Sequence, residues 1–205
     1  MSPRARAAGI GTTLVATAGL VGPQDASPAQ IEDLDVDKRR GRYELVATAF
    51  LDAPAEAIYE VLLDYEDNRF GRISGVYKES DYLEPAPDGT PIVYTRMEGC
   101  LLKGFFCVSM TRVERLETSE PYYIRTVALP EQSDFEHSVS EFRLEPEADG
   151  TRMHYRLEME PDFFVPPVIG PWYLKRTLMR GGIRAVNRIE RLARELGAHD
   201  TVAAR

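Results

Sequence analysis

The residue types that most often carry out chemistry are sparse in this chain. Its 205 residues include only three histidines, His137, His154 and His199. The sequence contains no HExxH motif, no Gly-rich phosphate-binding loop and no Ser-His-Asp arrangement. Solvent-facing histidines are the simpler interpretation, and the sequence predicts no catalytic residue, no metal and no other cofactor.

Five charged residues lie within predicted strands, where an inward-pointing side chain could orient the head group of a ligand. They are Arg96, Glu98, Arg112, Glu141 and Arg143. Successive side chains of a strand point to opposite faces of the sheet, but this alternation alone does not decide which of the five point inward. Ladders of opposite charge on the protein surface are the alternative, and the sequence leaves the choice open.

The two cysteines, Cys100 and Cys107, are separated by the six residues LLKGFF. If Lys103-Gly104 forms a two-residue hairpin turn, Cys100 lies directly opposite Cys107. Opposed residues in an antiparallel pair have Cα atoms roughly 4.5–5.5 Å apart, which a disulfide can span. We therefore expect a disulfide in an oxidising compartment, with two buried thiols as the alternative. Without a nearby histidine, two cysteines supply too few ligands for zinc.

Residues 151–160, TRMHYRLEME, alternate strictly between polar and apolar side chains. A period of two predicts a strand with one buried face and one face in water. The buried face consists of Met153, Tyr155, Leu157 and Met159. These side chains are candidates for lining a ligand-binding cavity, and plain core packing is the alternative.

A long amphipathic helix is predicted over residues 171–196, with Pro171 in its first turn. It supplies the remaining cavity candidates: Trp172, Leu174, Leu178, Gly182 and Val186. Gly182 lies on the apolar arc, and a glycine in mid-helix costs about 1 kcal/mol relative to alanine. The missing side chain leaves space for either a closely packed strand or a ligand.

The opposite face of this helix is rich in arginine and includes Arg180, Arg184 and Arg188. A nearly uncharged run, FFVPPVIGPW, precedes the helix and begins with Phe163 and Phe164. A basic face beside an apolar segment is typical of proteins that contact anionic membranes peripherally. The sequence predicts a membrane-docking surface here, and a solvated face beside a loop folded onto the core is the alternative.

The composition, with 43% hydrophobic and 28% charged residues, is that of a globular domain, and the net charge of −8 argues against general nucleic-acid binding. Residues 1–29 have the pattern of a secretory signal, with Arg4 and Arg6 before an uncharged run over residues 7–21. We therefore expect a periplasmic or secreted protein. An uncleaved N-terminal anchor and a disordered N-terminus with a misassigned start are the alternatives.

The rest of the chain divides into a linker (30–41), one domain (42–197) and a flexible tail (198–205). The domain begins with a strand over 42–51 and two short helices, the first with Asp52 as its expected N-cap. Six strands and the long helix follow. Because the links between strands are short, the sheet should be antiparallel. The predicted fold class is α+β, a helix-grip in which about seven strands form a curved sheet around the C-terminal helix.

Three groups of residues carry a resemblance by their order and spacing. They are DAPAE at 52–56, EFRLEP at 141–146 with GTRMHY at 150–155, and EP at 160–161 with VPP at 165–167. On these residues the chain resembles the START-like (SRPBCC) superfamily of polyketide cyclases and dehydrases, lipid-transport domains and coenzyme Q-binding proteins. The resemblance covers residues 42–196 and implies a deep apolar cavity between sheet and helix.

The resemblance implies that this cavity binds a hydrophobic small molecule or lipid, quinone-like or acyl, and that the protein transports it. A cyclase- or dehydrase-type enzyme acting in the same cavity is the alternative, because the fold alone does not determine the chemistry. Expected export and the lack of an evident acid–base pair favour the carrier. A third interpretation is a sensor or interaction module that uses the basic helix face. Besides the ligand, the expected partner is an anionic membrane, with neither nucleic acid nor metal.

Overall fold

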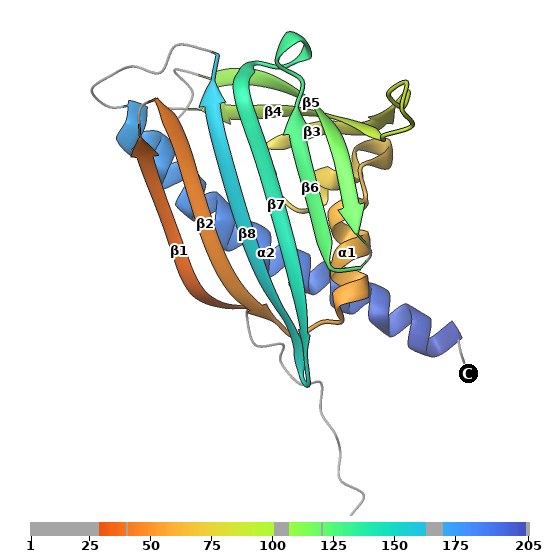
Figure 1. The fold of residues 1–205 in the computed structure, drawn as a ribbon. Coiled ribbons are helices and arrows are strands. Elements are labelled where there is room, and N and C mark those ends of the chain that lie inside the picture. Colours follow the sequence, from red (N-terminus) through yellow and green to blue (C-terminus); the bar gives the residue numbers. More distant parts are fainter. Residues whose placement is uncertain (1–28, 40, 101–106, 120, 163–169, 204–205) are drawn as a thin grey trace, which may run out of the picture.

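Eight strands form a single curved antiparallel sheet that wraps around one long helix (Figure 1). This computed structural model describes residues 29–39, 41–100, 107–119, 121–162 and 170–203. In chain order the strands are β1 (Gln30–Arg39), β2 (Arg42–Leu51), β3 (Tyr77–Leu83), β4 (Ile92–Cys100), β5 (Cys107–Ser119), β6 (Tyr123–Ala128), β7 (Phe135–Glu147) and β8 (Gly150–Pro161). Across the sheet they follow the order β1-β2-β8-β7-β6-β5-β4-β3.

The helices, apart from a short 3₁₀ segment in the connection between β6 and β7, lie on the concave side of this sheet (Figure 1). They are α1 (Ala55–Leu63), the short 3₁₀ segments η1 (Glu66–Arg72) and η2 (Pro130–Gln132), and α2 (Gly170–Ala203). The predicted helix-grip is confirmed, with eight strands in place of about seven.

The additional strand is β1, which occupies the segment predicted to be a linker. It pairs with β2 along its whole length, from Gln30 opposite Phe50 to Arg39 opposite Arg42. Its alternation is obscured in the sequence by acidic residues and by a bulge between Ile31 and Asp33. Only the pairing with β2 and the burial of its apolar side chains against the core make this polar segment a strand.

The ends of both helices differ from the sequence prediction for the same reason, a contact between distant segments. Asp52 does not cap α1: its backbone N–H donates to Glu190 Oε2 at 3.0 Å, and its carboxylate pairs with Arg194 at 3.1 Å. The helix α2 does not end near residue 196 but continues to Ala203, so the predicted flexible tail is largely helical. Gly197 lies against Pro54, where an added Cβ would be 3.9 Å from the proline ring. The residues just before α1 therefore pack against the C-terminal part of α2 at an ordinary van der Waals distance.

The two halves of α2 are packed differently. In the second half, Val186, Ile189 and Ala193 are buried in the same apolar cluster as the side chains of α1. In the first half, residues 177–182 are at most half-buried. The helix is therefore anchored to the core at its C-terminal half, and its N-terminal half covers a less tightly packed region.

The hairpin of β4 and β5 is closed by the predicted disulfide between Cys100 and Cys107. The two residues are directly opposite each other in the strand register, with Cα atoms 3.9 Å apart. The expected turn at Lys103-Gly104 lies outside the described residues. The prediction of the disulfide from the hairpin geometry is confirmed.

Candidate ligand-binding cavity

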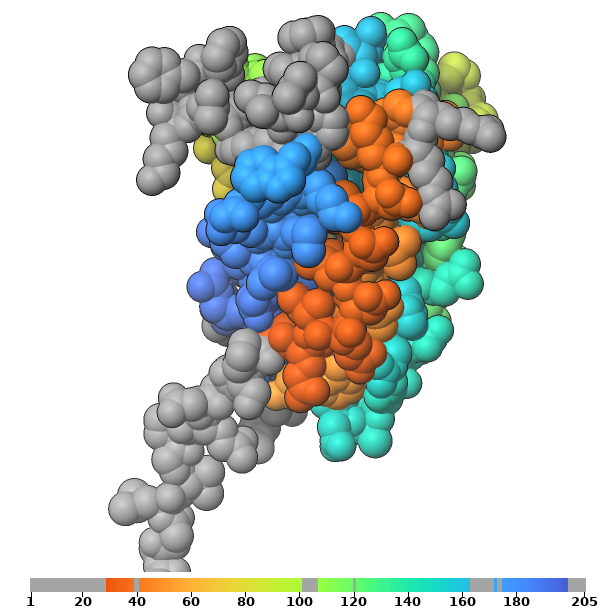
Figure 2. All heavy atoms as spheres, turned by 90° about the vertical axis from the view of Figure 1, so that its left-hand side faces the viewer, coloured from red at the N-terminus to blue at the C-terminus, as the bar shows by residue number. Residues whose placement is uncertain are grey.

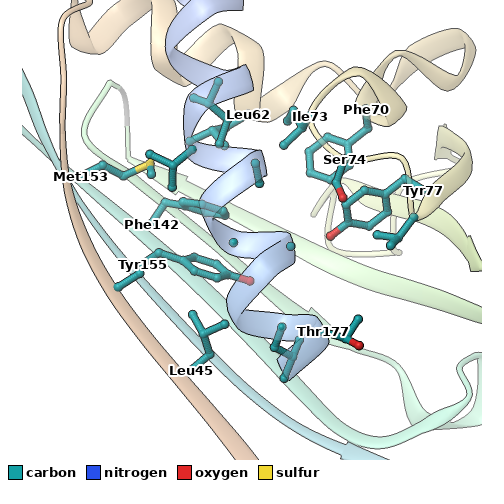
Figure 3. Close-up of a pocket in the computed structure, with 18 residues that line it drawn as sticks. Leu45, Leu62, Phe70, Ile73, Ser74, Tyr77, Phe142, Met153, Tyr155 and Thr177 are labelled. Carbon is teal, nitrogen blue, oxygen red and sulfur yellow. The ribbon is translucent and has the colours of Figure 1, made fainter. Parts of the chain in front are cut away.

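An apolar cavity of about 170 Å³ lies between the concave face of the sheet and the first half of α2 (Figure 3). Its walls come from three parts of the chain: strands β2, β7 and β8, the stretch from the end of α1 to the start of β3, and α2. The lining residues are Leu45, Ala47, Phe142, Met153 and Tyr155 from these strands, Leu62, Phe70, Ile73, Ser74, Val76 and Tyr77 from the second part, and Thr177, Leu178, Gly181, Gly182, Ala185, Val186 and Ile189 from α2. A dry cavity of about 150 Å³ accommodates a benzene molecule. The space here is thus of the size of one aromatic ring.

The structure places five of the predicted cavity residues in this lining: Met153, Tyr155, Leu178, Gly182 and Val186. The alternation of β8 directs Met153 and Tyr155 toward α2, and the helical period brings the other three to the facing side. Both patterns are properties of the local sequence, which is why the sequence alone predicts these residues.

Three of the other predicted cavity residues, Leu157, Met159 and Trp172, are absent from the described lining. Leu157 and Met159 share the inward face of β8 but are buried in a second apolar cluster with Val36 and Phe135, because the strand extends beyond the cavity. The Trp172 side chain is 64% exposed and lies against the Arg176 guanidinium, 5.5 Å from the ring centroid. The side chain of Leu174 lies outside the described part of the chain.

Gly182 lies both near a strand and beside the cavity, the two possibilities that the sequence left open. A Cβ built on it would lie 3.7 Å from Leu34 Cδ1 of β1, which is an ordinary packing distance. The glycine also borders the cavity, together with Gly181, where an added Cβ would meet nothing within 4 Å outside the helix. Strand β1 therefore approaches the helix at this point, and empty space remains beside it.

One of the five charged strand residues, Arg112, points to the concave side of the sheet. Its ion-pair partner there is Glu114, which the sequence analysis did not identify. The Arg112 side chain is 8% exposed and the Glu114 side chain is fully buried, with Arg112 Nε 3.0 Å from Glu114 Oε2. The N–H group is not aligned with the oxygen, so the contact is an ion pair rather than a hydrogen bond. The Thr126 hydroxyl donates to Glu114 Oε1 at 2.8 Å. Arg112, Glu114 and Leu116 are alternate residues of one strand and therefore point to the same face. The apolar Leu116 is the signal that could have identified this face as the buried one.

The other charged candidates lie on the convex side or at its edge. Arg96 bonds to Glu98 at 2.6 Å and to Glu79 at 2.7 Å, and both acidic side chains are substantially exposed. Glu141 accepts a hydrogen bond from Tyr123 at 3.0 Å, and Arg143 is exposed. These residues form the surface ladders that the sequence allowed as an alternative.

The electrostatics of the buried pair keep the interior close to neutral. Burial by itself lowers the pKa of Arg112, but the Glu114 carboxylate and nearby tyrosines raise it, so that the net pKa lies above the ordinary value. Arg112 is therefore a cation at every physiological pH, and its charge is compensated by Glu114. Such a pair presents little net charge to an adjacent ligand.

Two tyrosine hydroxyls point into the cavity from opposite walls, Tyr155 from β8 and Tyr77 from the start of β3 (Figure 3). Their rings are held by aromatic neighbours. Tyr155 stacks on Phe142 with ring centroids 4.4 Å apart, and Tyr77 meets Phe70 edge-on at 4.8 Å. Burial raises the pKa of Tyr155 well above its ordinary value, so its hydroxyl remains protonated. The lining is thus mainly apolar, with two phenolic hydroxyls held by aromatic neighbours and the smaller hydroxyl side chains of Ser74 and Thr177 beside them.

The predicted membrane-docking residues lie on or near the outer face of α2. Arg180 and Arg184 are exposed and Arg188 is half-buried, and within the described residues none of the three forms an ion pair. Figure 2 shows this helix beside strand β1 on one side of the molecule. Phe163 and Phe164 lie outside the described residues.

The described residues lack two features that would indicate other functions. They contain no group of three side chains placed to hold a metal ion. None of their helices combines the length and the apolar character needed to cross a membrane.

A curved antiparallel sheet that grips a C-terminal helix around an apolar cavity defines a START-like helix-grip protein. The family model described as polyketide cyclase/dehydrase and lipid transport matches residues 42–197. The chain therefore belongs to this family. A comparison of the sequence with curated proteins gives no match.

Solved structures of low sequence identity share the fold. The ZhuI aromatase/cyclase from Streptomyces sp. R1128 has a TM-score of 0.57 and 17% identity, covering 75% of this chain and 94% of its own. A START superfamily protein from Mycobacterium smegmatis has a TM-score of 0.55 and 22% identity, covering 73% and 98%. Human STARD10 has a TM-score of 0.56 and 11% identity, covering 82% and 76%. At these identities the likeness establishes the fold and not a shared ligand.

Proposed function

We propose that this protein binds a hydrophobic small molecule or lipid in the cavity beneath α2 and transports it. The observation that carries the proposal is the cavity itself. Protein interiors are close-packed, and an empty space costs about 24 cal/mol per Å³, so that 170 Å³ costs on the order of 4 kcal/mol. A cost of that size favours a cavity that is filled by a ligand.

The chemistry of the lining supports a carrier over a cyclase- or dehydrase-type enzyme. The carboxylate of Glu114 is occupied by Arg112 and Thr126. His137 and His154 pair with acidic side chains of neighbouring strands and are absent from the described cavity lining. A tyrosine with a raised pKa, such as Tyr155, gives up its proton less readily, which suits hydrogen bonding to a bound ligand.

We further propose that the protein works in the periplasm or outside the cell and contacts membranes with the outer face of α2. The disulfide supports an oxidising compartment. Arg180 and Arg184 are exposed and form no ion pair with the described residues, which supports attraction to anionic lipid, worth about 1 kcal/mol per basic residue near the surface. Cargo could then pass between the membrane and the nearby cavity.

Native mass spectrometry of the protein purified from its own host tests the proposed function. We expect a co-purifying hydrophobic molecule of defined mass. In parallel, Gly182→Leu should place a side chain in the cavity and lower the affinity for a displaceable one-ring dye, such as 4-(dimethylamino)benzonitrile, by more than tenfold. Ile183→Leu is the matched control, because Ile183 is 42% exposed and absent from the lining. Equal dye binding by both variants would contradict a ligand site in this cavity.

A further inference from the structure

The polar groups of the cavity select among hydrophobic ligands, and this inference rests on the proposed function. Tyr77 and Tyr155 project their hydroxyls into the same apolar space from opposite walls (Figure 3). Among the described residues, the Tyr77 hydroxyl has no hydrogen-bond partner. A polar group beside an apolar cavity loses free energy when it stays unpaired, so a ligand that pairs with it gains affinity.

Both hydroxyls are suited to donate rather than accept. The Tyr155 hydroxyl keeps its proton because burial raises its pKa, and the nearby Tyr77 raises that pKa further. A protonated phenol donates one hydrogen bond. Two donors that converge from opposite walls fit one oxygen with two lone pairs, which describes a carbonyl group.

The charge balance of the interior disfavours an anionic ligand. The nearest buried cation, Arg112, is already paired with Glu114 at 3.0 Å, and both side chains are almost completely buried. A carboxylate or phosphate that entered the cavity would lose its hydration without finding a free cation in the described lining. The arginines on the outer face of α2 do not change this, because Arg180 and Arg184 are exposed to solvent.

We propose that the ligand is a neutral hydrophobic compound with a ring-sized head that carries a carbonyl oxygen. The carbonyl accepts hydrogen bonds from Tyr77 and Tyr155, and the ring occupies the 170 Å³ between Met153 and Gly182. Aromatic ketones and quinone-like rings belong to this chemical class, whereas fatty acids and phospholipid head groups do not.

Three matched probes test this selectivity by displacement of the one-ring dye 4-(dimethylamino)benzonitrile: 4-propylacetophenone, its hydrocarbon isostere 4-propylcumene and its anionic counterpart 4-propylbenzoate. Because each hydrogen bond contributes a net factor of about 2 to 10, the ketone should bind the wild-type protein about tenfold or more tightly than the hydrocarbon. The benzoate should bind more weakly than the ketone. Tyr77→Phe and Tyr155→Phe should each lower the affinity for the ketone about 2- to 10-fold and leave the affinity for the hydrocarbon unchanged.

Tyr123→Phe is the control variant, because the Tyr123 hydroxyl donates to Glu141 on the convex side of the sheet. Equal affinities of the wild-type protein for ketone and hydrocarbon would overturn the proposed carbonyl selectivity and leave the proposed carrier function in place. Tightest binding of the benzoate would overturn it in favour of an anionic ligand. If none of the three probes displaced the dye, both the selectivity and the ligand-binding function would be refuted.

Discussion

Replacing Glu114 by glutamine measures how completely the structure encloses the ion pair behind the cavity. The Glu114 side chain is fully buried, and its carboxylate lies 3.0 Å from Arg112 Nε and accepts a hydrogen bond from Thr126 at 2.8 Å. Glutamine has nearly the same shape and can still accept the bond from Thr126. The substitution therefore removes the charge and leaves the Arg112 cation, 8% exposed, without its counter-ion.

Removing one partner of a buried ion pair costs about 3–5 kcal/mol, because the remaining charge is neither hydrated nor compensated. A domain of this kind has a total free energy of unfolding of about 5–15 kcal/mol. Glu114→Gln should thus remove a large fraction of the stability. Replacing both residues, Arg112→Met with Glu114→Leu, should change the free energy of unfolding little or increase it, because neither ion then has to be desolvated.

Urea denaturation followed by far-ultraviolet circular dichroism gives the free energy of unfolding of each variant. Glu98→Gln is the matched control, since it removes an exposed carboxylate from an ion pair with Arg96, which should cost less than about 1 kcal/mol. If Glu114→Gln costs no more than this control, water reaches Arg112. The argument that the cavity excludes anions would then be wrong.

Three further predictions concern other parts of the molecule. Reversing the charge of Arg180 and Arg184 together should reduce co-sedimentation with vesicles that contain anionic lipid. The control variant Arg143→Glu, on the convex face, should not reduce it. An equal loss in both variants would exclude a specific docking face. Gly181→Ala should raise the free energy of unfolding in urea by about 1 kcal/mol, because the added Cβ meets nothing within 4 Å outside the helix; a decrease would mean that α2 needs this glycine. The pKa of Asp88 is lowered to about 2, first of all by the backbone N–H group two residues later, so its charged form stabilises the fold above the unfolded pKa of about 4. The difference in free energy of unfolding between wild type and Asp88→Asn should therefore disappear as the pH falls from about 4 to about 2. If nuclear magnetic resonance showed the Asp88 carboxyl titrating near pH 4, the lowered pKa would be contradicted.

The elements that the sequence predicted correctly share a short-range signal. The alternation in residues 151–160 gave the inward face of β8, and the 3.6-residue period gave the buried stripe of α2. The hairpin between Cys100 and Cys107 was predicted because turn length determines which residues face each other across a two-stranded ribbon. In each case the information lies within about ten neighbouring residues.

The prediction failed where a residue's state depends on distant partners. The segment 30–39 is polar, and it is a strand only because β2 offers a free edge and the core accepts Leu34 and Val36. The inward position of Arg112 and Glu114 required the register of β5 within the sheet, since a one-residue shift would exchange its two faces. The structure also placed Trp172 on the surface, although the sequence analysis named it as a candidate for lining the cavity.

The sequence by itself determined that a curved antiparallel sheet packs against one amphipathic helix, because periodicity and turn chemistry are local properties. The tertiary structure decided which part of that interface remains open. The crossing of α2 over β8 leaves space beside Tyr155 and Gly182 but packs Leu157 and Met159 into solid core, although all four lie on predicted inward faces. A cavity is a property of three packed elements together, and no single element encodes its position.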